Sequence, residues 1–302
     1  MENYTIGNII KEYRIRLKIS QEDLSFGLCA VSTLSRIENG AQVPGRKLVE
    51  AFFSKMGMNP PASAIPMSKS DFKRENLEYE IIDKTADGDF HIFEQLENYK
   101  NCSASLDTLE QQFYLFFKSM AEDVFNHNCE KSLKEFESAL KLSLPSYELG
   151  KIPKVKMLTK IEIFILNNIA RNLNFSGEKE KSIELFEFLH SYLENEIVSE
   201  EEKAKILPVI LLNLENIYGE KGDFKKVLEL SEKGIEICTH YGKLTQFPYQ
   251  LFNKGWSLLK LNEIDDGIKY INQAFSIFDA MKENEDLEYG KKWVKENLNV
   301  DI

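Results

Sequence analysis

The sequence has few cysteines and no pattern that would hold a metal ion or a disulfide framework. Its four cysteines are Cys29, Cys102, Cys129 and Cys238, and no two of them form a C-x-x-C pair. Scattered cysteines of this kind are expected to be small buried side chains. His127 and His240 each stand beside a single cysteine, so no metal site is predicted.

Long hydrophobic runs are also absent. No stretch approaches the ~20 apolar residues that a membrane helix needs. The polar N-terminus, MENYTIGNIIKEYR, lacks the basic and then apolar layout of a signal peptide. We therefore expect a cytoplasmic protein without membrane contacts. Hydrophobic residues still make up 43% of the 302 residues, enough for the cores of about two domains.

Motifs that bind phosphates or support covalent catalysis are missing as well. The sequence contains no G-x-x-x-x-G-K-[ST] loop, no G-x-G-x-x-G and no G-x-S-x-G. Acidic pairs such as Glu200 and Glu202 fit the solvated first turn of a helix better than acid–base catalysis. The prediction is therefore that the protein is not an enzyme and needs no cofactor.

Charge of the two signs is unevenly distributed along the chain. The formal net charge is −11, which argues against a protein that coats nucleic acid. Residues 1–60, however, hold eight Lys and Arg against six Asp and Glu, a net charge of +2, whereas the rest carries −13. The first 60 residues are expected to have a different kind of partner from the remainder.

A change in composition marks a domain boundary. The segment GMNPPASAIPMSKS, residues 57–70, contains three prolines and small polar residues without a helical period, which is typical of a linker. We therefore expect one domain over residues 1–58, a linker over 59–70 and a second domain over 71–302.

Short helices joined by tight turns are predicted before this linker. Thr5 can cap a first helix, and Ser20 can cap a second helix, running to about Leu28, by accepting from the backbone N–H of Asp23. Cys29–Val31 then turns the chain into a helix over Ser32–Asn39. Two helices joined by a three-residue turn are a helix-turn-helix arrangement.

The same residues resemble a known family. RIRLKISQEDLSFGLCAVSTLSRIENGAQVP is similar to the Cro/C1-type (XRE) helix-turn-helix through S-Q-E-[DE]-L, S-R-I-E-N-G and the following proline, and the resemblance covers residues 5–58. The turn is one residue shorter than in most such domains and carries Leu28-Cys29. This variant resembles the peptide-pheromone regulators of Gram-positive bacteria, the Rgg, NprR, PlcR and PrgX group.

The resemblance implies a DNA-reading role for the helix after the turn. In the family, the glutamine after the capping serine meets the phosphate backbone, and exposed residues of the next helix read the major groove. Hydroxyls and an arginine can reach base edges and phosphates. The implied DNA-binding residues are Gln21, Ser32, Thr33, Ser35 and Arg36. Two alternatives stay open: Ser32 could be only an N-cap, and Ser35 only a solvated position.

Two further residues match a structural feature of the family. Arg14 and Glu38 correspond to its partly buried ion pair between the first and third helices. We expect this pair to hold the domain together rather than to contact DNA.

After residue 70 the sequence predicts a series of helical hairpins. Two segments, NLENIYGEKGDFKKVLELSEKGIEI and NKGWSLLKLNEIDDGIKYINQAFSI, align with Gly222 on Asn262. Similar turns occur at Gly177, at Gly88 and at about Asn128, so the units repeat every 40 to 49 residues. Each turn residue is expected to adopt φ > 0. The prolines after residue 70 are expected near helix edges.

These hairpins resemble tetratricopeptide (TPR) repeats, although the usual period is ~34 residues. Irregular repeats of this kind also suit the pheromone regulators. The expected fold is therefore all-α: an N-terminal XRE-type helix-turn-helix domain, followed by a right-handed superhelix of about five degenerate TPR-like hairpins. The concave surface of such a superhelix is suited to binding a peptide.

An asparagine recurs nine residues before three consecutive turn positions, at Asn168, Asn213 and Asn253. An asparagine side chain carries a donor and an acceptor, so a row of them could pair with the main chain of an extended peptide. The pheromone regulators use asparagines of these helices in this way, which favours the peptide interpretation. The alternative is that this asparagine is a structural contact between helices.

Other side chains near these asparagines could complete a peptide site. Aromatic residues could form pockets, and an arginine could hold a peptide carboxylate. The candidates are Phe164, Arg171, Asn216, Tyr249 and Trp256.

Together these patterns predict a cytoplasmic, homodimeric transcription regulator of the quorum-sensing type. Two N-terminal domains would bind an inverted repeat in double-stranded DNA. A short signalling peptide, a pheromone, in the concave TPR surface would control this binding. The alternative function is a TPR adaptor that acts mainly through protein–protein contacts.

Overall fold

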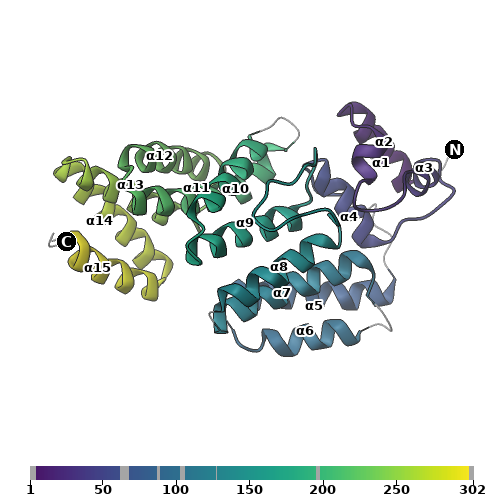
Figure 1. The fold of residues 1–302 in the computed structure, drawn as a ribbon, viewed down its shortest axis with the longest axis horizontal. Helices are drawn as coiled ribbons and strands as arrows, with labels where there is room; N and C mark the ends of the chain where they lie inside the picture. The colour runs from purple at the N-terminus through teal and green to yellow at the C-terminus, as the bar shows by residue number, and fades with distance from the viewer. Residues whose placement is uncertain are drawn as a thin grey trace. The chain divides into compact units, whose positions relative to one another are not determined.

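The computed structural model describes residues 5–61, 68–86, 89–102, 106–126, 128–194 and 198–298 (Figure 1). Every regular element in these ranges is an α-helix. The chain forms two compact units: unit 1 is residues 1–185 with 195–199, and unit 2 is residues 186–194 with 200–302. Helix α10 (Lys179–Leu193) contributes to both units. None of the helices in the described ranges combines the length and apolar character that a membrane crossing requires.

Unit 1 begins with four short helices, which we call the head: α1 (Ile6–Arg16), α2 (Gln21–Ser25), α3 (Val31–Glu38) and α4 (Arg46–Lys55). Thr5 caps α1, and the Ser20 side chain accepts from the backbone N–H of Asp23 at 3.0 Å, as predicted. Fully buried apolar side chains from all four helices fill its core: Ile10, Leu24, Leu34, Ile37, Val49, Phe52 and Phe53.

Two boundaries in the head differ from the sequence prediction. Helix α2 ends at Ser25 rather than near Leu28, because Gly27 turns the chain at φ +72°. Helix α3 begins at Val31, with Ala30 in the N-cap position and without a side-chain cap. Ser32 therefore lies inside α3 and is not its N-cap.

The rest of unit 1 consists of α5 (Lys69–Ala86), α6 (Ile92–Asn101), α7 (Thr108–Asn126), α8 (Cys129–Lys141), α9 (Lys160–Phe175) and the first part of α10. Helix α5 packs against α6 and α7, and α8 packs against both α7 and α9. The turn between α9 and α10 contains Gly177 at φ +89°. Asn128 caps α8 at φ −103°, so the prediction of a positive φ there is wrong, and Gly88 lies outside the described residues.

The head contacts the remaining helices of unit 1 through a buried ion-pair cluster. Arg46 and Lys47 of α4 each place a nitrogen 2.8 Å from the Glu78 carboxylate of α5. The Tyr99 hydroxyl donates to the same carboxylate at 3.0 Å. Burial opposes the charge on Glu78, but Lys47 and Arg46 hold its pKa below the usual range. These contacts fix α4 to α5 and α6.

The long connection between α8 and α9 makes a second contact with the head. Met157 is 3% exposed and belongs to the head's own apolar core. The Lys160 backbone N–H donates to Ser54 Oγ at 2.6 Å, and Lys156 pairs with Asp23 at 3.0 Å. The head is therefore attached to residues far along the chain as well as to its sequence neighbours.

Unit 2 contains the second part of α10, then α11 (Glu200–Lys221), α12 (Phe224–Tyr241), α13 (Phe247–Lys260), α14 (Ile264–Met281) and α15 (Asn284–Leu298). Gly222 and Asn262 adopt φ +81° and +65° in its turns, as the repeat alignment predicted. Consecutive helices pack as antiparallel hairpins that share one core. Pro208 lies inside α11 rather than at a helix edge, which corrects that prediction.

Candidate functional site

Helix α3 presents a polar face to solvent. Leu34 and Ile37 are fully buried, while Ser32 and Arg36 are exposed and Thr33 and Ser35 are half-buried. The 3.6-residue period separates the two sets, because positions three apart share a face. The backbone N–H groups of the first turn of α3 also favour a nearby anion. This face can therefore supply hydroxyl, guanidinium and backbone donors to one ligand.

A network of charged and amide side chains lies beneath this face. Arg14 Nε and Nη2 donate to Glu38 Oε1 and Oε2 at 2.6 and 2.8 Å, so the expected ion pair is present. Gln21 Nε2 donates to Glu38 Oε2 at 2.7 Å. Burial opposes the charge on Glu38, but Arg14 and Gln21 hold its pKa below the usual range. The network links α1, α2 and α3 and fixes the orientation of α3.

Gln21 has a double role available in this arrangement. One of its two amide protons is used by Glu38. Because an amide nitrogen carries two protons, the other remains for a phosphate oxygen. The side chain is half-buried at the first position of α2. The structure therefore places Gln21 where it can join the polar face of α3 without leaving Glu38.

The candidate peptide residues of unit 1 lie on α9 and make contacts within the unit. Asn168 is 4% exposed, and its Nδ2 donates to the backbone oxygen of Phe164 at 2.9 Å. Arg171 pairs with the buried Asp123 of α7. Asn172 Nδ2 lies 3.3 Å from the same Asp123 carboxylate. A peptide carboxylate at Arg171 would therefore compete with Asp123.

The candidates on α11 and α13 of unit 2 differ in exposure. Asn216 is exposed and Asn213 is half-buried, and their spacing of three places them on one face of α11. Asn253 is 7% exposed, and its Nδ2 donates to Glu215 Oε2 at 2.7 Å. In this conformation the amide of Asn253 serves a contact between α13 and α11.

The two aromatic candidates of unit 2 pack against other aromatic rings. The centroid of Tyr249 lies 4.9 Å from that of Phe278, and the centroid of Trp256 lies 5.4 Å from that of Trp293 on α15. The Trp256 ring also lies over Gly219, where a Cβ atom would come within 2.1 Å of it. Trp256 is thus part of the contact between α11, α13 and α15.

Sequence reasoning missed Glu215, which carries the most unusual charge of unit 2. It is fully buried, and burial raises its pKa to about 8 although Asn253 and Gln250 favour the ionised form. Its signal was its position, because Glu215 follows Leu207 and Leu211 at spacings of eight and four on the apolar side of α11. A glutamate in such a stripe must be buried together with its neighbours.

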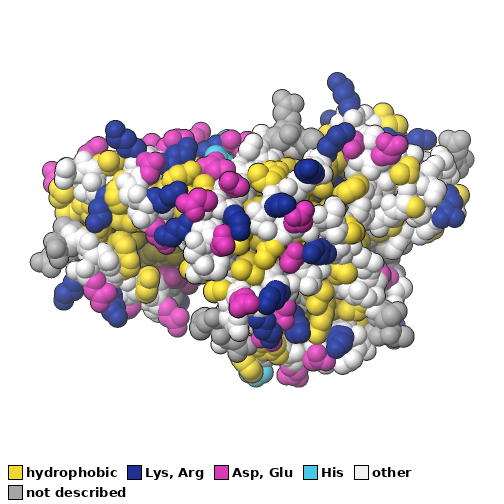
Figure 2. Space-filling model, viewed as in Figure 1, with side chains coloured by type: hydrophobic (Ala, Val, Ile, Leu, Met, Phe, Trp, Pro, Cys, Tyr) yellow, Lys and Arg dark blue, Asp and Glu magenta, His cyan; other side chains and the backbone are white. Residues whose placement is uncertain are grey.

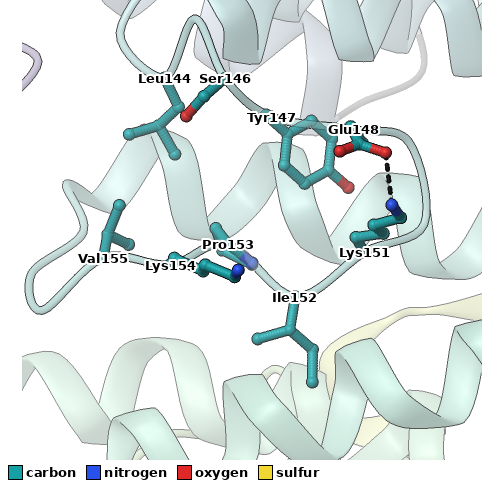
Figure 3. Close-up of a pocket in the computed structure, with 9 residues that line it drawn as sticks. All are labelled: Leu144, Ser146, Tyr147, Glu148, Lys151, Ile152, Pro153, Lys154 and Val155. Carbon is teal, nitrogen blue, oxygen red and sulfur yellow. Dashed lines mark ion pairs between the residues drawn. The ribbon is translucent and has the colours of Figure 1, made fainter.

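The described part of the chain also contains a small cavity formed by the connection between α8 and α9 (Figure 3). Its volume is about 230 Å³, and Glu148 and Lys151 form an ion pair of 2.5 Å beside it. The lining residues are Leu144, Ser146, Tyr147, Glu148, Lys151, Ile152, Pro153, Lys154 and Val155. No residue predicted to bind DNA or peptide lines it. Among the described residues no group of three or more His, Cys, Asp or Glu side chains could hold a metal ion.

Comparison with known proteins matches both parts of the chain. Residues 10–60 match the HTH_3 helix-turn-helix family model. No curated protein sequence matches the chain. The structure is similar to that of PlcR from Bacillus thuringiensis in complex with the peptide PapR7 and DNA, at 22% identity and a TM-score of 0.60, covering 94% of this chain and 98% of that one.

Two other solved structures are similar over nearly the full length. A variant of the SHP pheromone receptor Rgg2 of Streptococcus dysgalactiae is 16% identical, with a TM-score of 0.53 and coverage of 97% of this chain and 100% of that one. ComR of S. thermophilus, in complex with DNA and its signalling peptide ComS, is 17% identical, with a TM-score of 0.52 and coverage of 95% and 98%. These likenesses confirm the predicted fold class and the resemblance at the level of the fold.

Proposed function

We propose that this protein is a cytoplasmic transcription regulator that binds operator DNA through α3 and is controlled by a short signalling peptide bound to its helical repeats. It acts as a homodimer, so that two heads meet the two halves of an inverted repeat. The observation that carries the proposal is the polar face of α3, held from beneath by Arg14, Glu38 and Gln21 in a domain that matches a helix-turn-helix family.

The residues of this face suit the two kinds of contact that DNA recognition needs. Arg36 can reach guanine acceptors or phosphates, and the hydroxyls of Ser32, Thr33 and Ser35 can accept from or donate to base edges. Gln21 and the first turn of α3 suit the phosphate backbone, which positions the head without reading sequence. The net charge of +2 in residues 1–60 favours this contact in a chain of −11.

The repeats offer a different surface, suited to an extended peptide. Asn213 and Asn216 lie on one face of α11, where their amides can pair with a peptide main chain. Asn168 and Asn253 would join them only by exchanging their present partners, the Phe164 carbonyl and Glu215. Such an exchange would give the peptide different affinities for two conformations, which is what control of DNA binding requires.

The proposal is tested by selecting bound fragments from a pool of random duplexes with the full chain. The selection is run with and without synthetic peptides taken from short secreted-peptide reading frames beside the gene. An inverted repeat with half-sites about one helical turn apart is expected. Recovery of no motif under either condition would favour the adaptor function instead.

Arg36→Ala then tests the role of α3 on the selected operator. Because Arg36 is exposed, the substitution leaves the head core intact. We expect specific affinity to fall by about 1–3 kcal/mol, roughly 5- to 150-fold. Lys260→Ala, a change at an exposed lysine of α13, is the matched control and should leave affinity unchanged. Equal operator binding by the Arg36 variant, measured by fluorescence anisotropy, would remove Arg36 from the interface.

A further inference from the structure

Helix α5 carries an exposed apolar face although most of its residues are charged or polar. Phe72, Tyr79 and Ile82 are 58%, 60% and 44% exposed. Their spacings of seven and three place them on one side of the helix, and we call them the α5 stripe. Exposed apolar residues that cluster on one face of a soluble protein mark a contact surface.

The opposite side of α5 accounts for all of its packing within unit 1. Ile81 is fully buried in the core shared with α6 and α7. Glu78 is 5% exposed and binds Arg46 and Lys47 of the head. The α5 stripe therefore faces away from the helices that hold α5 in place (Figure 1).

The charges beside the stripe are arranged with opposite signs at its two ends. Lys69 and Lys73 are exposed near the start of α5, whereas Glu80 and Asp83 are exposed near its end. Elsewhere the two signs are mixed, as on the face shown in Figure 2. A face that is basic at one end and acidic at the other is complementary to a copy of itself turned around.

Turning a second α5 antiparallel about a two-fold axis near Glu75 and Asn76 brings the complementary groups together. Counting from that axis, Lys69 comes opposite Asp83, and Lys73 comes opposite Glu80. Phe72 of one helix comes opposite Tyr79 of the other. Each contact is repeated by symmetry, as an interface between identical chains requires.

We propose that the α5 stripe binds a second copy of this chain, with the two α5 helices antiparallel. The inference rests on the proposed homodimer and assigns its interface. The apolar side chains of the stripe would be covered by those of the second copy, and the flanking lysines and acids would fix the antiparallel direction.

The first test is sedimentation velocity of the full chain with Tyr79→Lys. We expect the wild type to be a dimer in the micromolar range and the variant to dissociate at least ~10-fold more readily, because a charge replaces a buried aromatic contact. Tyr289→Lys is the matched control, since Tyr289 of α15 is 70% exposed, and it should remain dimeric. Circular dichroism must show equal helix content in all three proteins.

The second test exchanges the charges. Lys73→Glu alone and Glu80→Lys alone should each weaken the dimer, because like charges then face each other across the two-fold axis. The double variant Lys73→Glu, Glu80→Lys should restore it, since both chains then carry the reversed pair. A different protein bound at this face would not restore dimerisation in this way.

The outcomes separate this interface from the proposed function. A wild type that stays monomeric at about 0.1 mM, where an interface of standard size is saturated, overturns the α5 dimer. A dimer that none of the α5 variants weakens overturns it too. A chain that selects no DNA motif but loses its dimer in the α5 variants refutes only the regulator function.

Discussion

Replacing Glu215 by glutamine should make unit 2 more stable at neutral pH. Glu215 is fully buried, and its described partners are amides rather than cations: Asn253 Nδ2 donates to its Oε2 at 2.7 Å. Its Oε1 has no hydrogen-bond partner among the described residues, and the same is true of Gln250 Oε1 in the same cluster. A protonated carboxyl supplies a donor that these oxygens lack.

The size and sign of the effect follow from the pKa of Glu215. Its ordinary value is 4.5, and burial raises the pKa of the folded protein's carboxyl to about 8. Between these values folding takes up a proton, so the free energy of unfolding falls as pH rises. Each pH unit is worth ~1.4 kcal/mol, which gives a loss of about 3 kcal/mol by pH 7 and about 4 kcal/mol by pH 8.

The assay uses a feature of the sequence. The two tryptophans, Trp256 and Trp293, both lie in unit 2, so tryptophan fluorescence during urea unfolding reports that unit alone. We expect Glu215→Gln to remove most of the pH dependence between about pH 5 and pH 8, because glutamine keeps the shape and does not titrate. Glu236→Gln, at an exposed glutamate of α12, is the control. Identical pH slopes in the wild type and Glu215→Gln would refute the reasoning.

Two further substitutions test contacts in the two units. Arg14→Ala should destabilise the head by about 3 kcal/mol, because Glu38 would stay buried without its cation; thermal unfolding followed by circular dichroism measures this, and an unchanged midpoint would contradict it. Gly219→Ala should lower the stability of unit 2 by about 1–3 kcal/mol, since the added Cβ would lie 2.1 Å from the Trp256 ring. Gly45→Ala, where an added Cβ meets no atom within 4 Å, should leave the tryptophan signal unaffected.

The helices could be predicted because their signals are local. Ser20 and Asp23 mark the start of α2, and the turns at Gly177, Gly222 and Asn262 follow from residues that tolerate a positive φ. The start of α3 was misplaced by one residue because Ala30 provides no side-chain cap. Helix boundaries that depend on backbone bonds alone leave no trace in the residue types.

The contacts between distant segments could not be predicted in the same way. Met157 fills the core of the head, although about a hundred residues separate it from Met56 of the same core. The asparagine repeat was found correctly, but its spacing does not tell whether an amide faces a peptide or a neighbouring helix. The structure pairs Asn253 with Glu215, whose burial depends on how α11, α12 and α13 pack. Such partners are set by packing between elements and not by local sequence.

Helix α5 connects the head with the proposed dimer contact, because adjacent residues point to opposite sides of it. Glu78 binds Arg46 and Lys47 of the head, and Tyr79 belongs to the α5 stripe. Two chains paired through α5 would therefore hold their heads in a defined relation, as two half-sites on DNA require. A peptide that changes DNA affinity must then favour a state in which either the α5 pairing or the contact at Glu78 differs. The charge-exchanged α5 variants distinguish the two, because they alter the pairing and leave Glu78 in place.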